Sequence, residues 1–329
     1  MCTGLTLKTK DGYHLFGRSM DIEYSFNQAV HLVPRNFEYI NVVTNTKEKT
    51  KFAMLGMGIS IDNHPLLAEA FNEKGLGCAG LNFPGYAHYE EEVKEGMINL
   101  GVYDLILYIL SNFEKVEDVK EAMKDVNIVN KEFKEGLQVP TLHWIVTDKE
   151  GKTIIIEKTK EGLKIFENNI GVLTNSPTFD FHITNLRQYI GLSEVNHKQT
   201  TWGDLKLSPL GQGLGLFGLP GDFSPPSRFV RASYLKSRVI EKYEVMESVR
   251  EFFHILSNVS MINGSVITAE GLDDITYYKS CMIQEKGIYY YSTYNNSQIN
   301  AIDMFKEDLD RPDMKIFEYH NEQSINYQN

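Results

Sequence analysis

Strand-like segments in this chain occur as consecutive pairs joined by short turns, and this pairing restricts the folds that it can adopt. The first pair alternates apolar and polar residues over 3–8 and resumes over 13–18 after the turn Lys10-Asp11-Gly12. Further pairs are 69–71 with 76–83, 142–147 with 153–157, and 276–284 with 287–294. Strands joined by such short turns run antiparallel, so the sequence predicts antiparallel sheets.

Helical periodicity lies in blocks between these strand pairs. It covers residues 103–113, 116–126, 181–189, 227–244 and 248–256. Because helix blocks alternate with strand blocks, and not with single strands, the helices are expected on the outer faces of antiparallel sheets. No repeat, low-complexity tract or linker divides the chain, so we expect one α+β domain over residues 1–329.

A long segment, residues 191–226, has neither periodicity. It contains the runs Gly211-Gln212-Gly213-Leu214-Gly215 and Gly218-Leu219-Pro220-Gly221. Loops of this length in a compact domain are usually functional or lie at an interface.

Composition excludes several classes of partner. The 329 residues carry 33 Lys and Arg against 44 Asp and Glu, a net charge of -11, and no basic run could follow a phosphate backbone, so nucleic acid is not expected. The longest apolar stretch, residues 105–110, is far shorter than the roughly 20 residues of a membrane span. The opening Met1-Cys2-Thr3-Gly4 does not resemble an export signal, and we expect a cytoplasmic protein.

The cysteines and histidines predict neither disulfides nor a metal site. Cys2, Cys78 and Cys281 form no CxxC pair, and the nine histidines have no HExxH spacing. Phosphate-binding, dinucleotide-binding and serine-hydrolase motifs are also absent. Each cysteine is therefore interpreted as a single thiol, and no metal is expected.

Cys2 is the most informative of these thiols. Cysteine is small enough for Met1 to be removed, which would leave a thiol and a free α-amine on one residue. An α-amine titrates at about 7.7–8.0, so near neutral pH it can act as a base. One residue would then supply nucleophile and base, without a histidine partner. The alternative is an inert thiol at the start of a strand.

The first hairpin predicts which residues lie near Cys2. With Asp11 and Gly12 at the centre of the turn, Cys2 lies opposite Asp21, whose carboxylate could hold the α-amine. In the same register Arg18 faces the other side of the sheet, unless a bulge at Gly17 turns it. An arginine beside a thiol favours the thiolate, so Arg18 would be useful on the Cys2 side. The alternative for Arg18 and Asp21 is a surface ion pair.

Several separated blocks, in order along nearly the whole chain, resemble one known family. They are Met1-Cys2-Thr3, Gly17-Arg18-Ser19-Met20-Asp21, residues 72–84, Leu173-Thr174-Asn175-Ser176-Pro177 and residues 219–229. In these blocks the chain resembles the choloylglycine hydrolases, particularly those that act on bile salts. The resemblance implies a four-layer αββα sandwich of N-terminal nucleophile hydrolases with two antiparallel sheets, consistent with the alternating blocks.

The resemblance also implies a catalytic set, namely Cys2, Arg18, Asp21, Asn82, Asn175 and Arg228. Cys2 is the implied nucleophile and its α-amine the base, while Arg18 and Asp21 position and polarise it. Asn175 is expected beside the nucleophile, and Arg228 completes the polar site. Asn82 and a backbone N–H are expected to stabilise the oxyanion, which needs preorganised donors in a dry cleft. For Asn82 and Asn175 the alternative is turn capping.

The implied reaction is hydrolysis of the amide joining a bile acid to glycine or taurine, through a thioester on Cys2 and without a cofactor. The implied partner is thus a conjugated bile salt. Walls of an apolar pocket are assigned to Met20, Ile59, Ile61, Leu137 and Leu142, each of which could equally be ordinary core. The family also implies a homo-oligomer, most simply a tetramer, assembled through residues 191–226.

Two other functions compete with this one. Penicillin V acylase has the same implied fold and nucleophile but acts on a phenoxyacetyl group, and family members of that kind carry Tyr where this chain has Asn82. A non-catalytic ligand-binding member of the fold would be favoured by loss of Cys2, Arg18, Asp21 or Asn175, and all four are present.

Overall fold

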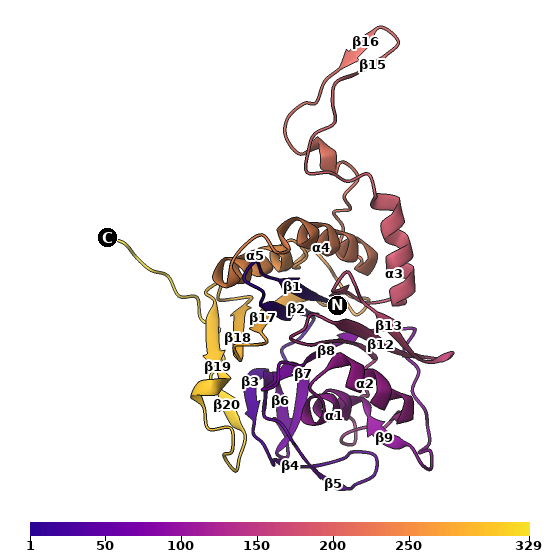
Figure 1. Ribbon diagram of the computed structural model, residues 1–329, viewed down its shortest axis with the longest axis vertical. Coiled ribbons are helices and arrows are strands. Elements are labelled where there is room, and N and C mark those ends of the chain that lie inside the picture. Colours follow the sequence, from indigo (N-terminus) through magenta and orange to yellow (C-terminus); the bar gives the residue numbers. More distant parts are fainter.

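Two antiparallel sheets face each other in the computed structural model, which describes residues 1–329 (Figure 1). The six-stranded sheet has the order β14 (Val172–Leu173), β1 (Cys2–Lys8), β2 (His14–Ile22), β17 (Ile275–Ile283), β18 (Ile288–Thr293) and β19 (Asn300–Asp303). The eight-stranded sheet has the order β13 (Gly162–Glu167), β12 (Thr153–Thr159), β11 (Leu142–Thr147), β8 (Gly77–Asn82), β7 (His64–Asn72), β6 (Met54–Ile61), β3 (Ala29–Val33) and β20 (Lys315–Phe317). All four predicted strand pairs are therefore confirmed.

Three small two-stranded sheets complete the β-structure. They are β4 (Glu38–Ile40) with β5 (Lys47–Lys49), β9 (Ile98–Gly101) with β10 (Val126–Val129), and β15 (Thr200–Trp202) with β16 (Leu205–Leu207).

Helices cover both outer faces of the sandwich (Figure 1). On the six-stranded sheet lie α4 (Pro225–Val239) and α5 (Val245–Ser257), and on the eight-stranded sheet lies α1 (Leu105–Asn112) with α2 (Val116–Ala122) beside it. The remaining helix, α3 (Phe179–Asn185), stands at the end of the sandwich near α4. The layers are thus helix, sheet, sheet and helix, as predicted. None of these helices combines the length and the apolar character that crossing a membrane requires.

The predicted helix 227–244 extends too far at its C-terminal end. Helix α4 begins with Pro225 and Pro226, whose fixed φ suits a first turn, but it ends at Val239 because Ile240 is extended and Glu241 adopts a φ of 53°. The chain there bonds to the first hairpin instead: Glu241 N donates to Lys8 O at 2.8 Å. Tertiary hydrogen bonds thus replace the next helical turn.

The register of the first hairpin differs by one residue from the prediction. Thr9 N donates to Tyr13 O at 2.9 Å, so residues 10–12 form the turn, with Gly12 at a φ of 89°. Cys2 consequently lies opposite Met20, and the prediction that it lies opposite Asp21 is wrong. Arg18 pairs with Gly4 instead of Leu5, which places it on the Cys2 side of the sheet without a bulge.

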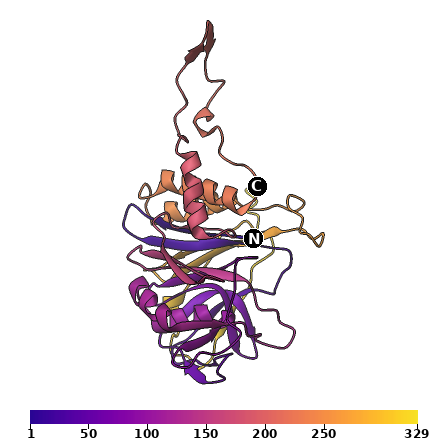
Figure 2. The same cartoon turned by 90° about the vertical axis from the view of Figure 1, so that its right-hand side faces the viewer.

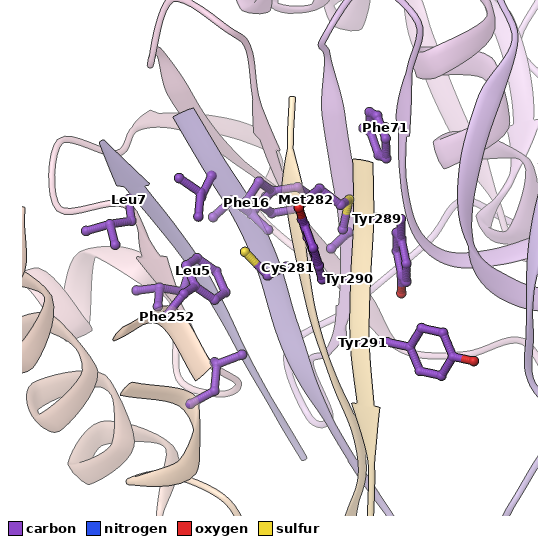
Figure 3. Close-up of a cluster of buried hydrophobic side chains, with 14 of the residues drawn as sticks. Leu5, Leu7, Phe16, Phe71, Phe252, Cys281, Met282, Tyr289, Tyr290 and Tyr291 are labelled. Atoms are coloured by element: carbon purple, nitrogen blue, oxygen red, sulfur yellow. The ribbon is translucent and has the colours of Figure 1, made fainter. Parts of the chain in front are cut away.

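Alternate residues of β1 and β2 therefore face different layers. The missing side chain of Gly4 leaves room for Ile145, since a Cβ on Gly4 would lie 3.3 Å from Ile145 Cγ2 of the opposite sheet. Cys2 and Arg18 share this inter-sheet face with Gly4. Leu5 lies on the other face, and Figure 3 shows it beside Phe252 of α5.

Much of residues 191–226 projects far from the sandwich as an arm that carries β15 and β16 at its tip, and the last two of these residues begin α4 (Figures 1 and 2). Apolar side chains on this arm are mostly exposed, and Trp202, for example, is 74% exposed. We call residues 191–226 the arm below.

Candidate active site

The Cys2 thiol lies between the two sheets at the first residue of β1. Only 3% of Cys2 is exposed, and Arg18 Nη2 donates a hydrogen bond to its Sγ. Cys78 and Cys281 are also free but fully buried, and burial raises the pKa of both thiols. Of the three thiols, only that of Cys2 accepts a hydrogen bond from an arginine.

Arg18 has an acceptor for every N–H although only 1% of it is exposed. Nε donates to Ser19 O at 3.1 Å, and Nη1 donates to Gly80 O at 2.5 Å and Ala68 O at 3.4 Å. Besides Cys2 Sγ, Nη2 reaches Met20 Sδ at 3.5 Å. Burial disfavours its charge, but the groups around it, Cys2 foremost, raise the pKa of Arg18 and keep it cationic.

Arg228 approaches the same residue from the helix layer. It projects from α4 and donates from Nη1 to Cys2 O and, at 2.8 Å, to Thr3 Oγ1. Its Nη2 donates to Asn175 Oδ1 at 2.6 Å. Burial lowers the pKa of Arg228, and the carboxylate of Asp21, 3.9 Å away, opposes this shift. Two arginines therefore hold Cys2, one from each face of its sheet.

Asn175 links the backbone of Cys2 to the second sheet. Its Oδ1 accepts from Cys2 N at 2.8 Å, and its Nδ2 donates to Asn82 O at 2.6 Å. Since the side chain is buried and both ends are bonded, its orientation is set. The expected position of Asn175 beside the nucleophile agrees with this geometry.

Asp21 lies in the same cluster but not in the expected place. Its carboxylate points to the helix side, where it accepts from Thr276 Oγ1 at 2.6 Å and Ser19 Oγ at 3.1 Å. Its backbone pairs with Met1, since Asp21 N donates to Met1 O at 2.9 Å. Burial raises the pKa of Asp21, although Arg228 opposes the shift. Asp21 therefore reaches Cys2 through Arg228 and the backbone.

Asn82 is the last residue of β8, and its side-chain amide nitrogen is available to bind a ligand. Its Oδ1 accepts from Thr141 Oγ1 at 2.8 Å, while its Nδ2 makes no hydrogen bond within the chain. The side chain is exposed, beside the bond between its carbonyl and Asn175. The Nδ2–H of Asn82, next to the residues that hold Cys2, can therefore donate a hydrogen bond to a ligand.

Three of the residues expected to form apolar walls, Ile59, Ile61 and Leu142, lie at one end of the eight-stranded sheet, whereas Met20 lies on β2 of the other sheet. Because neighbouring strands are antiparallel, the ends of β6 and β8 and the start of β11 meet there, with Leu142 directly opposite Asn82. Ile59, Ile61 and Leu137 are half-buried and lie outside both hydrophobic cores of the protein. Met20 belongs to the core that includes the six-stranded sheet and α5, and Leu142 packs against the core that includes α1 and α2.

Two buried histidines that the sequence did not single out hold the segment with Asn175. His182 bonds through Nε2 to Asn175 O at 2.8 Å and stacks on Phe229 with ring centroids 4.8 Å apart. His143 bonds to Thr174 O at 3.0 Å and to Glu157 Oε1 at 3.1 Å. These partners are distant in sequence, so histidine spacing could not reveal them.

Nothing in the site has the donor set of a metal centre. No group of three or more His, Cys, Asp or Glu side chains is arranged to hold a metal ion. The polar groups around Cys2 are guanidinium and amide N–H donors, which suit a developing negative charge.

Comparison with solved structures defines the class of fold. C2A and R18L variants of conjugated bile acid hydrolase from Clostridium perfringens superpose with a TM-score of 0.95, at 53% identity over 100% of both chains. Penicillin V acylase from Agrobacterium tumefaciens, 21% identical, has a TM-score of 0.75 over 96% of this chain and 90% of its own, which shows the shared fold alone. The fold is that of the N-terminal nucleophile hydrolases.

Comparison of sequences narrows the class to one family. The model for linear amide C–N hydrolases of the choloylglycine hydrolase family matches residues 2–317. The bile salt hydrolase/transferase of Clostridium perfringens is 54% identical over 329 residues, 100% of both chains. The chain belongs to the choloylglycine hydrolase family.

The buried state of His182 generates a pH-dependent prediction. Burial lowers the pKa of His182 to about 4 from its ordinary 6.5, so the unfolded chain binds more protons between these values. The contribution of neutral His182 to the free energy of unfolding is fully present above pH 6.5. The free energy of unfolding should fall by up to about 3 kcal/mol as the pH drops from 6.5 through 4. Urea denaturation of wild type and His182→Gln measures this.

The His182→Gln protein should show a flatter dependence of unfolding free energy on pH, because it cannot take up this proton. His197→Gln removes an exposed histidine and should keep the wild-type slope. Parallel curves for wild type and His182→Gln would contradict the assignment.

Proposed function

We propose that the protein hydrolyses the amide bond that joins a bile acid to glycine or taurine. The observation that carries the proposal is the set of contacts to Cys2: Arg18 donates to its thiol, Arg228 donates to its carbonyl oxygen, and its backbone nitrogen donates to Asn175. A thiol surrounded by arginine and amide N–H donors suits nucleophilic attack on a carbonyl carbon. The bile salt as substrate is inferred from the names of full-length relatives.

The proposed mechanism begins with removal of Met1. The nitrogen of Cys2, now an amide hydrogen-bonded to Asn175 Oδ1, would become an α-amine at the same place. The Met1 amine forms an ion pair with Asp274 at 3.3 Å, and this contact would be released. The freed amine of Cys2 can take the proton from its own thiol.

Acylation then proceeds by attack of the Cys2 sulfur on the amide carbonyl carbon. The carbonyl oxygen becomes negative, and the free Nδ2–H of Asn82 together with a backbone N–H would stabilise it. The C–N bond breaks as the protonated α-amine returns its proton to the leaving nitrogen of glycine or taurine. The product is a thioester between Cys2 and the bile acid.

Deacylation uses the same groups with water as the nucleophile. The α-amine takes a proton from water, the resulting hydroxide attacks the thioester carbon, and the C–S bond breaks as the protonated α-amine returns its proton to the leaving sulfur. The bile acid leaves as a carboxylic acid and the Cys2 thiol is restored. No cofactor enters either half of this reaction.

Binding of the steroid is assigned to apolar contact and not to long-range attraction. The net charge of -11 repels an anionic conjugate at a distance, so capture depends on burying the steroid against Met20, Ile59, Ile61, Leu137 and Leu142.

We also propose a homotetramer in the cytoplasm. The arm presents exposed apolar side chains, including Trp202, Leu205, Leu210 and Phe217, far from the sandwich, where only another chain could cover them. A reducing compartment suits a nucleophile that must remain a free thiol.

The first prediction concerns the nucleophile. Intact mass should show that Met1 is absent from active protein, and Cys2→Ala should abolish hydrolysis of glycocholate with an unchanged circular dichroism spectrum. Cys78→Ala is the matched control and should retain turnover, because that thiol is buried among apolar residues. Near-normal turnover by Cys2→Ala, or an active protein that retains Met1, would refute this mechanism.

The second prediction separates bile salts from penicillin V. Wild type should have a higher kcat/KM for glycocholate and taurocholate than for penicillin V. Asn82→Ala should lower kcat/KM for the bile salts roughly 10²–10³-fold through loss of one oxyanion donor. Asn82→Tyr should narrow the preference, mainly by harming the bile salt reaction. A wild type that prefers penicillin V would favour the acylase function, and unchanged kinetics would make Asn82 a turn residue.

The third prediction concerns assembly. Light scattering at micromolar concentration should give the mass of a tetramer, and deleting residues 199–208 at the tip of the arm should lower it. The deletion lies far from Cys2, so alkylation of the thiol should persist as assembly weakens. A monomeric wild type would rule out this use of the arm.

A further inference from the structure

Glu69 is a fully buried carboxylate in a strand that is otherwise apolar around it. It lies in β7 between Ala68 and Ala70, with 0% of its surface exposed. Burial of a carboxylate without compensating partners is strongly unfavourable. The partners of Glu69 therefore indicate what the chain gains from it.

A β-bulge turns Glu69 into the space between the sheets. Met57 of β6 pairs with Glu69, but the next residue of β6, Gly58, pairs with Leu67, so Ala68 is the extra residue. The bulge changes which face each following side chain occupies. Leu67 packs with the helix layer, whereas Phe71, two residues after Glu69, packs in the inter-sheet cluster.

Both oxygens of Glu69 accept hydrogen bonds from the opposite sheet. Tyr278 donates to Oε2 at 2.8 Å and Tyr289 donates to Oε1 at 2.7 Å. Figure 3 shows Tyr289 on the same side of its strand as Phe71. Burial raises the pKa of both tyrosines well above the usual value, so they remain donors. This arrangement suits a carboxylate that accepts at both oxygens.

Glu69 is also the only carboxylate within ion-pair distance of Arg18. Arg18 Nε lies 3.9 Å from Glu69 Oε2, while the hydrogen bonds of the guanidinium go to neutral carbonyls and to sulfur. The same bulge supplies one of those carbonyls, Ala68 O. Burial raises the pKa of Glu69 and Arg18 opposes the shift, as expected of charges that compensate each other.

We propose that Glu69 is a positioning residue that holds Arg18 between the sheets and shares its positive charge, and so determines how strongly Arg18 favours the Cys2 thiolate. The inference rests on the proposed function only in taking Cys2 as the nucleophile. While a thioester exists, the sulfur carries no negative charge, and Glu69 is then the neighbouring anion that keeps Arg18 in place.

Other ionisable groups around the Cys2 and Glu69 sites contribute to the same field. They are Asp21 on β2, Arg228 on α4, Asp274 before β17, the Met1 or Cys2 amine, Tyr278 and Tyr289 on β17 and β18, and Tyr319 after β20. No carboxylate among these groups lies within 4.0 Å of Arg18, whereas Glu69 does. A change at Glu69 should therefore act on Cys2 mainly through Arg18.

The test is the pH dependence of Cys2 alkylation by iodoacetamide in the processed full-length protein. Glu69→Gln keeps the size of the side chain but removes its charge, so the charge of Arg18 acts on the thiol alone. The midpoint of the alkylation profile should move to lower pH, by about one unit at an effective dielectric constant near 20. Glu69→Asp retains the charge and should restore much of the wild-type profile.

Glu73→Gln is the matched control, because it removes a carboxylate from the turn after β7 that pairs with Arg35 and not with Arg18. Its alkylation profile should coincide with that of wild type. If Glu69→Gln does not fold, Glu69→Asp, which retains the charge but draws the carboxylate back from Arg18, should shift the midpoint in the same direction by less.

A folded Glu69→Gln protein with the wild-type midpoint, or Cys2 that resists alkylation throughout, would overturn the inference. Alkylation needs no bile salt, so a protein that shows the shift yet does not cleave glycocholate would refute the proposed substrate while leaving the role of Glu69 intact.

Discussion

The guanidinium of Arg18 can be buried only where acceptors surround it, and no single strand provides them. Its N–H groups reach Ser19 O on its own strand, Ala68 O and Gly80 O on the facing sheet, and the Cys2 thiol. A buried charge without such partners would be strongly destabilising. The same side chain therefore links the two sheets and contacts the Cys2 thiol.

The second arginine connects the site to the outer layer and to the arm. Arg228 lies in the first turn of α4, directly after the arm, and binds the carbonyl of Cys2. The arm follows α3, whose His182 bonds to Asn175. The arm is thus flanked by two helices, α3 and α4, that each contribute a residue in contact with the site. Packing of the arm against another chain would act on a region already tied to Cys2.

Local turn signals were sufficient for the strand pairs, whereas the four-layer order was implied by the resemblance to the family. Gly12 and Gly75 adopt positive φ in turns that the sequence marks clearly, and alternation on each side defines the strands. The turn signals were insufficient for the register of the first hairpin, because a turn that contains Asp11 and Gly12 can have either two or three residues. That one residue decided whether Arg18 faced Cys2 or the helices.

The chain's own pattern was enough to establish an α+β protein with antiparallel sheets and an unusual thiol at position 2, since turns and alternation are local properties. The resemblance to a family added Asn82, Asn175 and Arg228, which no spacing rule selects. Only the folded chain placed His143 and His182 against the segment that holds Asn175, and Glu69 beside Arg18. Their partners lie on strands and helices distant in sequence, and side chains meet across such distances only when the sheets pack.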